Sequence, residues 1–302
     1  MSDPFSAQRL DGRILVVTGS TQGLGAAIAT RAASLGAAGI VVCGRDARRG
    51  EAVAERLRAL RCESVYVRAD LAEESQCRRI VQACGERFGR LDGLVNAAGL
   101  TTRGTLDDTS IALWDRLFAI NVRAPFVLMQ EAARLMRRDG GGGSVVSIIS
   151  VASHGGEPVL TGYAAAKGAL AVLTRNVAYQ LQPDRIRVNG LNIGWTATEG
   201  EHAVQTQSGR AADWLAEADA SSPFGRLLRP DADVAPMVTY LLSDAAQMVT
   251  GSVMDFDQTV LGPSGEHVEP VPHDAGRGDR RGSGAGQQSP QACVASPGPR
   301  TA

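Results

Sequence analysis

The stretch Thr18-Gly19-Ser20-Thr21-Gln22-Gly23-Leu24-Gly25 decides the fold that we predict for this chain of 302 residues. It follows an apolar run at 14–18 and precedes a helical pattern at about 24–35. Glycines in such a turn let the chain reverse sharply and approach a pyrophosphate, while the helix N-terminus offers free N–H groups to phosphate oxygens. The alternative is a glycine-rich turn without a ligand. Its place between a strand and a helix favours a dinucleotide.

Short apolar runs alternate with helical patterns along the rest of the chain. Strands are predicted at 14–18, 40–43, 64–70, 91–96, 144–150, 186–192 and 252–257, and helices at 24–35, 47–60, 73–88, 110–138, 163–181 and 234–242. Continuous apolar strands separated by helices are typical of a parallel sheet that is buried on both faces. We therefore expect an α/β fold: a doubly wound, parallel, seven-stranded sheet of the Rossmann type with helices on both faces.

The alternation predicts one domain over residues 1–261. The segment at about 195–230 is long, mixed in composition and contains two tryptophans, so we expect a lid there rather than a core element. Residues 262–302 hold eight Gly and six Pro but no Leu, Ile, Phe, Tyr or Trp. Such a segment buries too little apolar surface to offset its ordering entropy, which predicts a disordered, low-complexity tail.

Charge and cysteine content argue against several classes of protein. The 31 basic residues nearly balance the 32 acidic ones, which gives no electrostatic basis for binding nucleic acid or an anionic membrane. No apolar run approaches the ~20 residues that span a bilayer, and none precedes Ile14, so neither a membrane span nor a secretory signal is expected. The five cysteines form no CxxC motif. We expect free thiols in a cytoplasmic protein, without disulfides or a metal site.

Lys167 is the one lysine among thirty arginines, and it stands four residues after Tyr163. Residues at this spacing share one face of a helix. A phenol has a pKa of ~10, which must fall by about 3 units for acid–base work near neutrality. One cation near ~4 Å contributes about that much at an effective dielectric of ~20. The alternative is an unrelated pair of residues on an ordinary Ala-rich helix.

Two more polar residues fall at positions where chemistry is expected. Ser150 ends the predicted strand 144–150, at the sheet edge where ligands bind, and its hydroxyl can donate to a carbonyl oxygen. A serine that only caps a turn is the alternative. Asn121 precedes Pro125 by four residues, and proline has no N–H for the Asn121 carbonyl. This predicts a kink and a free acceptor for a proton-relay water, or simply a kink.

The end of the second predicted strand, Gly44-Arg45-Asp46, bears on cofactor choice. An acidic residue there binds the 2′-OH of NAD, whereas an arginine pairs with the 2′-phosphate of NADP. We expect a preference for NADP(H), with NAD(H) as the second possibility. The alternative is that Arg45 is a solvated loop residue and Asp46 caps the next helix.

Together these motifs resemble the short-chain dehydrogenase/reductase family, in its single-domain branch of about 250 residues. The resemblance spans about 13–261 and rests on TGSTQGLG (18–25), Asp70, NAAG (96–99), Asn121, Ser150, YAAAK (163–167) and NIGWTAT (192–198). It implies that Tyr163 is the catalytic acid/base and that Lys167 lowers its pKa and holds the nicotinamide ribose. It also implies that Ser150 polarises the substrate oxygen and that Asn121 anchors a water. The implied cofactor contacts are Gly19, Ser20, Gln22, Gly23, Leu24, Gly25, Arg45, Asp70, Leu71, Asn96, Ala98, Gly99, Tyr163, Lys167, Thr196 and Thr198.

Three features depart from the family pattern: NAAG stands for NNAG, Ile193-Gly194 stands for Pro-Gly, and the segment beyond about 262 has no counterpart. None removes a catalytic residue. We expect an NADP(H)-dependent oxidoreductase that interconverts a secondary alcohol and a ketone by hydride transfer. The alternatives are a 3-oxoacyl thioester reductase of the same family and a non-catalytic protein that senses NADP(H).

The substrate is expected to be a small molecule held between the stretch at 151–162 and the segment at 195–230. Candidate lining residues are His154, Glu157, Leu160, Trp195, His202, Trp214 and Phe224. Two tryptophans favour an apolar or ring-shaped face on the substrate, while His154 and Glu157 either contact a polar group or face solvent. The resemblance further implies a homodimer or homotetramer in which the Ala-rich helix 163–181 meets its partner.

Overall fold

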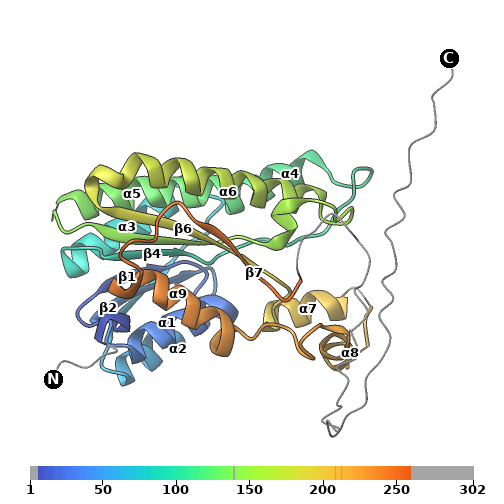
Figure 1. The fold of residues 1–302 in the computed structure, drawn as a ribbon, viewed down its shortest axis with the longest axis horizontal. Coiled ribbons are helices and arrows are strands. Elements are labelled where there is room, and N and C mark those ends of the chain that lie inside the picture. The colour runs from blue at the N-terminus through green and yellow to red at the C-terminus, as the bar shows by residue number, and fades with distance from the viewer. Residues whose placement is uncertain (1–5, 139, 208, 212, 260–302) are drawn as a thin grey trace, which may run out of the picture. The chain divides into compact units, whose positions relative to one another are not determined.

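The computed structural model describes residues 6–138, 140–207, 209–211 and 213–259, and its centre is a parallel sheet (Figure 1). The strands are β1 (Ile14–Val17), β2 (Gly39–Gly44), β3 (Glu63–Arg68), β4 (Gly93–Asn96), β5 (Gly143–Ile148), β6 (Ile186–Ile193) and β7 (Val253–Phe256). All six pairings are parallel, in the order β3-β2-β1-β4-β5-β6-β7. The predicted seven-stranded doubly wound sheet is confirmed. Its order reverses between β1 and β4, the switch point at which such sheets bind ligands.

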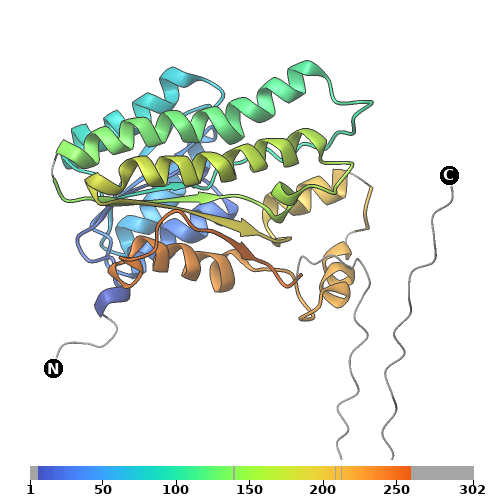
Figure 2. The ribbon, with the colours of Figure 1, turned by 45° about the horizontal axis from the view of Figure 1, so that its top comes forward.

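Helices cover both faces of the sheet. They are α1 (Gly23–Ser34), α2 (Ala47–Ala59), α3 (Glu74–Phe88), α4 (Ile111–Phe118), α5 (Ala124–Arg138), α6 (Thr161–Leu181), α7 (Glu199–Gln207), α8 (Trp214–Ser221) and α9 (Ala235–Leu242). In Figure 1, α1, α2 and α9 lie below the sheet, and α3, α5 and α6 lie above it. Figure 2 shows α5 and α6 running side by side across that second face.

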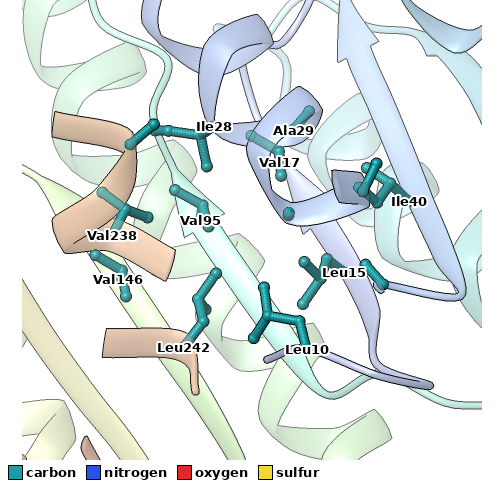
Figure 3. Close-up of a cluster of buried hydrophobic side chains, with 14 of the residues drawn as sticks. Leu10, Leu15, Val17, Ile28, Ala29, Ile40, Val95, Val146, Val238 and Leu242 are labelled. Atoms are coloured by element: carbon teal, nitrogen blue, oxygen red, sulfur yellow. The ribbon is translucent and has the colours of Figure 1, made fainter. Parts of the chain in front are cut away.

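Alternate residues of the strands build two hydrophobic cores, one on each face. Leu15 and Val17 of β1 point toward α1 and α9, where Ile28 and Val238 meet them (Figure 3). Val16, between them in sequence, belongs to the opposite core with α3, α5 and α6. Because successive side chains of a strand face opposite ways, both faces need apolar residues. This explains why the strands read as continuous apolar runs rather than alternating ones.

The predicted helix at 110–138 is interrupted by a wider turn. Between α4 and α5, residues Ala119–Arg123 form a π-helical turn in which the Ala124 N–H donates to the Ala119 carbonyl, five residues back. Pro125 explains the interruption, because it has no N–H for the Asn121 carbonyl. The expected kink therefore takes the form of a π-helical turn at Asn121.

The segment at 195–230 carries α7 and α8, which the sequence pattern did not resolve. Trp195 stacks on Trp214 with ring centroids 5.6 Å apart, and the Trp214 indole N–H donates to Nδ1 of His202 at 2.9 Å. The two short helices are thus joined by aromatic contacts of their own, and they lie beyond the carboxyl ends of β6 and β7 (Figure 1).

Three further sequence-based expectations concern the cysteines, membrane-spanning helices and the C-terminal tail. The four described cysteines, Cys43, Cys62, Cys77 and Cys84, are free and buried. Within the described part of the chain, no helix combines the length and apolarity that crossing a bilayer requires. The tail predicted at 262–302 lies outside the described residues.

The burial of strand side chains in the two cores predicts how a substitution changes the free energy of unfolding. Leu15 is 1% exposed in β1, whereas Leu106 is 84% exposed. Leu15→Ala should lower the free energy of unfolding by about 2–5 kcal/mol, because it removes buried contacts and leaves a cavity. Leu106→Ala should change it by less than about 0.5 kcal/mol. Denaturant unfolding of both variants checks this, and equal effects would contradict the burial of Leu15 in the core.

Candidate active site

A cleft of about 660 Å³ opens at the switch point of the sheet. Its walls are the turn between β1 and α1, the ends of β4 and β5, the start of α6 and the turn that leads into α7. The volume falls within the range of small-molecule and cofactor sites. The residues predicted from the sequence that line it are Gly19, Gln22, Gly23, Leu24, Gly25, Arg45, Asp70, Leu71, Ala98, Gly99, Ser150, Tyr163, Lys167, Thr196 and Thr198.

The glycine turn leaves no room for side chains. Gly19 has a φ of +63°, and a Cβ there would lie 2.8 Å from the Ala98 Cα. A Cβ on Gly25 would lie 2.5 Å from the Gly19 carbonyl oxygen. Only glycine fits at these two positions, so the turn has no side chains there and its backbone lines the cleft. Such a cradle fits a pyrophosphate, so these residues fit a dinucleotide cofactor.

Tyr163 and Lys167 meet inside the cleft on the inner face of α6. The Lys167 Nζ lies 5.7 Å from the centre of the Tyr163 ring and donates to the Ile148 carbonyl at 2.8 Å. Lys167 is 3% exposed and Tyr163 is 9% exposed. The spacing predicted from the sequence thus becomes a buried cation beside a buried phenol, at the carboxyl end of β5.

Burial moves the two pKa values in opposite directions. Burial raises the pKa of Tyr163 to about 12, with hydrogen bonding to Ser150 lowering it and the charge of Glu201 raising it. Burial lowers the pKa of Lys167 to about 8. Charged forms lose hydration in the interior, which disfavours phenolate and ammonium alike. In the protein without a bound cofactor, the Tyr163 phenol therefore stays protonated at neutral pH.

Ser150 caps a turn and also lines the cleft. Its Oγ accepts from the Ala152 N–H at 3.2 Å, which caps a 3₁₀ turn at Val151–His154. The same side chain lines the cleft and is hydrogen-bonded to Tyr163. The turn therefore holds the hydroxyl beside the phenol, where a substrate oxygen can contact both.

Three predicted site residues do not line the cleft. The Asn121 side chain bonds to the Leu100 backbone in both directions, at 2.9 and 3.0 Å. The Ser20 hydroxyl donates to the Val17 carbonyl at 2.6 Å and accepts from the Cys43 N–H at 3.0 Å. The Asn96 Nδ2 donates to Ser147 at 3.3 Å, and its Oδ1 has no hydrogen-bond partner among the described residues. All three side chains hold the strand ends and loops that carry the site.

At the far end of the cleft, Arg45 and Asp46 have different roles. Asp46 caps α2, since its Oδ1 accepts from the Arg49 N–H at 3.0 Å. Arg45 is exposed, lines the cleft and forms no ion pair with any described residue. Its guanidinium is therefore available to an anion, and the carboxylate next to it is already engaged.

The predicted substrate residues are only partly brought together. Glu157, Leu160 and Trp195 line the cleft, but His154, His202, Trp214 and Phe224 do not. His154 instead bonds to Asp255 at 2.8 Å. Sequence reasoning missed Glu201, which lines the cleft. The pattern Thr198-x-x-Glu201 marks a helix start, as in a capping box, but it does not show where the carboxylate points.

Comparison with known proteins identifies the family. Residues 19–258 match the family model described as enoyl-(acyl carrier protein) reductase. The chain belongs to the short-chain dehydrogenase/reductase family. It is 34% identical to cis-4-hydroxycyclohexanecarboxylate dehydrogenase of Sinomonas cyclohexanicum, over 81% of this chain and 95% of that protein.

Solved structures of the family superpose closely on this fold. A gluconate 5-dehydrogenase from Burkholderia cenocepacia, in complex with NADP and tartrate, matches with a TM-score of 0.75 and 32% identity, covering 85% of this chain and 98% of that one. A 7α-hydroxysteroid dehydrogenase complexed with NADH and 7-oxo glycochenodeoxycholic acid matches with a TM-score of 0.77 and 29% identity, covering 85% and 97%. The chain is an NAD(P)-dependent dehydrogenase/reductase.

The buried ammonium should make stability depend on pH. The Lys167 pKa is lowered from 10.5 to about 8, so between these values the unfolded chain keeps a proton that the folded protein has lost. Stability therefore rises with pH across this window, and the full penalty, about 3 kcal/mol, is present below it. The advantage in unfolding free energy of Lys167→Met over the wild type should shrink by up to that amount between about pH 7 and pH 10.5. Denaturant titrations at both pH values test this, and a constant difference would refute it.

Proposed function

We propose that this protein is an NADP(H)-dependent oxidoreductase that interconverts a secondary alcohol and a ketone, with Tyr163 as general acid and base. The observation that carries the proposal is the grouping of Tyr163, Lys167 and Ser150 in one cleft with the bare glycine turn. A bound nicotinamide supplies or accepts the hydride. The protein's own residues supply the proton and the polar contacts.

In the direction of reduction, Tyr163 donates its proton to the substrate oxygen. Its raised pKa keeps the phenol protonated at neutral pH, which suits an acid. Ser150, hydrogen-bonded to the phenol, donates to the same oxygen as charge develops there. In oxidation the phenol must lose its proton. The Lys167 ammonium, 5.7 Å from the ring centre, stabilises the phenolate that results.

Asn121 supports proton transfer in our proposal, although its side chain does not line the cleft. Its side chain holds the Leu100 backbone at the cleft wall, and it stands in the π-helical turn where Pro125 offers no N–H to its carbonyl. A water bound to that carbonyl connects the buried lysine to solvent in our proposal.

The cofactor preference rests on Arg45. Its guanidinium stands beside the end of β2 and forms no ion pair within the described part of the chain, and Asp46, the neighbouring acid, caps the helix. A planar guanidinium matches a phosphate through two hydrogen bonds, so a 2′-phosphate gains a contact that a ribose hydroxyl does not. NAD(H) is the alternative cofactor.

We also propose a lid, an oligomeric state and a cellular location for the enzyme. The segment at 195–230 acts as a lid over the substrate end of the cleft. Exposed apolar side chains on α5 and α6, Phe126, Val172 and Tyr179, support self-association as a homodimer or homotetramer. The free thiols support a cytoplasmic location.

Removing the phenol hydroxyl tests the chemistry. Tyr163→Phe should lower kcat by about 10²-fold or more while the cofactor binds as before, because only the proton donor is lost. Tyr179→Phe, on the exposed side of the same helix, is the matched control and should keep full activity. Reduced nicotinamide is followed by absorbance with a panel of ketones, and its binding by fluorescence. Tight cofactor binding with no turnover of any ketone or alcohol by the wild type would favour a sensor instead.

Removing the guanidinium tests the cofactor preference. Arg45→Ala should weaken NADP(H) binding by about tenfold or more and leave NAD(H) nearly unchanged, since a charge-assisted hydrogen bond to phosphate is lost. Arg48→Ala, an exposed neighbour on α2 that does not line the cleft, is the control. Equal losses for the two cofactors, or a wild type that prefers NAD(H), would contradict the assignment.

A further inference from the structure

The turn that carries Ser150 is held by side chains that lie outside the cleft. Ser150 stands directly before the 3₁₀ turn Val151–His154: its Oγ caps the turn, and its carbonyl accepts from the Ser153 N–H at 2.8 Å. Ala152 of this turn packs in one apolar cluster with Tyr163. The placement of the turn therefore decides where the Ser150 hydroxyl lies relative to the phenol.

His154 ends the turn and anchors it on the last strand of the sheet. Its Nε2 lies 2.8 Å from Oδ1 of Asp255 in β7. Burial acts to raise the pKa of Asp255, but hydrogen bonds from Asn192 and His154 lower it overall. The charge of Arg175 on α6 acts in the same direction. An ionised carboxylate only accepts hydrogen bonds, so the His154 Nε2 carries a proton and is the donor.

Asn192 ties the turn to the same carboxylate a second time. It pairs directly with Asp255 in the parallel register of β6 and β7, so both side chains leave the same face of the sheet. Its Nδ2 donates to Oδ1 of Asp255 at 2.8 Å, and its Oδ1 accepts from the Ser153 hydroxyl at 3.2 Å. Asn192 is 1% exposed and directly precedes Ile193 and Gly194, which line the cleft. Side-chain hydrogen bonds thus join the turn to this part of the cleft wall.

The two residues after His154 do not fix the turn. Gly155 and Gly156 have φ values of +86° and +91°, and a Cβ on either would meet no atom of the described chain within 4 Å. His154, Asn192 and Asp255 do not line the cleft themselves. They can therefore affect the reaction only through the residues that they hold in place.

We propose that His154 is a positioning residue whose hydrogen bond to Asp255 keeps the Ser150 hydroxyl beside the Tyr163 phenol. The proposal rests on the proposed roles of Ser150 and Tyr163 and adds the contact that keeps them aligned. The His154 and Asp255 side chains are 42% and 47% exposed, so their pair contributes little to global stability. Its effect falls on the orientation of one hydroxyl, where a small displacement lowers the rate.

Two substitutions separate the hydrogen bond from the imidazole ring. His154→Ala removes the donor, whereas His154→Gln keeps an N–H group that can reach Asp255. His154→Ala should lower kcat for a ketone about fivefold to tenfold and leave KM for NADP(H) within about twofold, because the glycine turn is untouched. His154→Gln should recover kcat to within about twofold of the wild type. Asp244→Asn, which removes the charge from an exposed pair with Arg13 ahead of β1, is the matched control and should keep full activity.

The Tyr163 phenol gives a readout that needs no turnover. Burial raises the pKa of Tyr163 and hydrogen bonding to Ser150 lowers it, so a displaced Ser150 leaves the pKa higher. The pKa is measured with oxidised NADP bound, as the phenolate absorbance of each variant minus that of its Tyr163→Phe counterpart. His154→Ala and Ser150→Ala should each raise the Tyr163 pKa by about 0.5 or more, and the double variant should match Ser150→Ala alone.

The outcomes of this titration distinguish the inference from the proposed function. The expected pKa changes without turnover of any ketone support the inference, and only the proposed function then fails. A Tyr163 pKa that is the same in His154→Ala and in the wild type overturns the inference, whatever the turnover. An equal effect of His154→Ala with and without the Ser150 hydroxyl also overturns it, because His154 would then act on the phenol by another route.

Discussion

The burial of one ammonium beside one phenol is the constraint on which the site depends. Lys167 gives up hydration and, among the described residues, regains one hydrogen bond, from its Nζ to the Ile148 carbonyl at 2.8 Å. Tyr163 is buried with it, so neither residue carries its charge easily. Opposite charges close together in such surroundings interact more strongly than in water. Burial thus disfavours the charged form of each residue, and a further charge that enters the cleft will move both pKa values.

The fold brings this pair to the right edge of the sheet. Because β1 and β4 are neighbours at the switch point, the glycine turn after β1 faces the ends of β4 and β5. α6 packs against β6 and places Tyr163 and Lys167 one turn apart on its inner face. Sheet topology and local packing thus determine the geometry together.

Much of this arrangement can be predicted from the sequence. Strand runs and helix spacing predict the doubly wound sheet, and the positions of Ser150, Tyr163 and Lys167 predict a shared cleft. The sequence does not show that the Ser20 hydroxyl donates to the Val17 carbonyl. A serine in a glycine-rich turn has the same sequence pattern whether its side chain faces a ligand or the strand. Nor does it show the pKa of Tyr163, which depends on three-dimensional burial. Glu201 was missed for a related reason: helix capping is local, whereas the direction of its carboxylate depends on Trp195 and Gln205.

The family assignment and the geometry support one account of how the phenol is used. Burial keeps Tyr163 protonated, and a positive charge beside it makes the phenolate accessible. A difference titration of phenolate absorbance, wild type minus Tyr163→Phe, measures this directly with and without oxidised NADP. The account predicts that the Tyr163 pKa is near 12 in the free enzyme and falls by about 2 units or more when the oxidised cofactor binds. An unchanged pKa in the complex would contradict it.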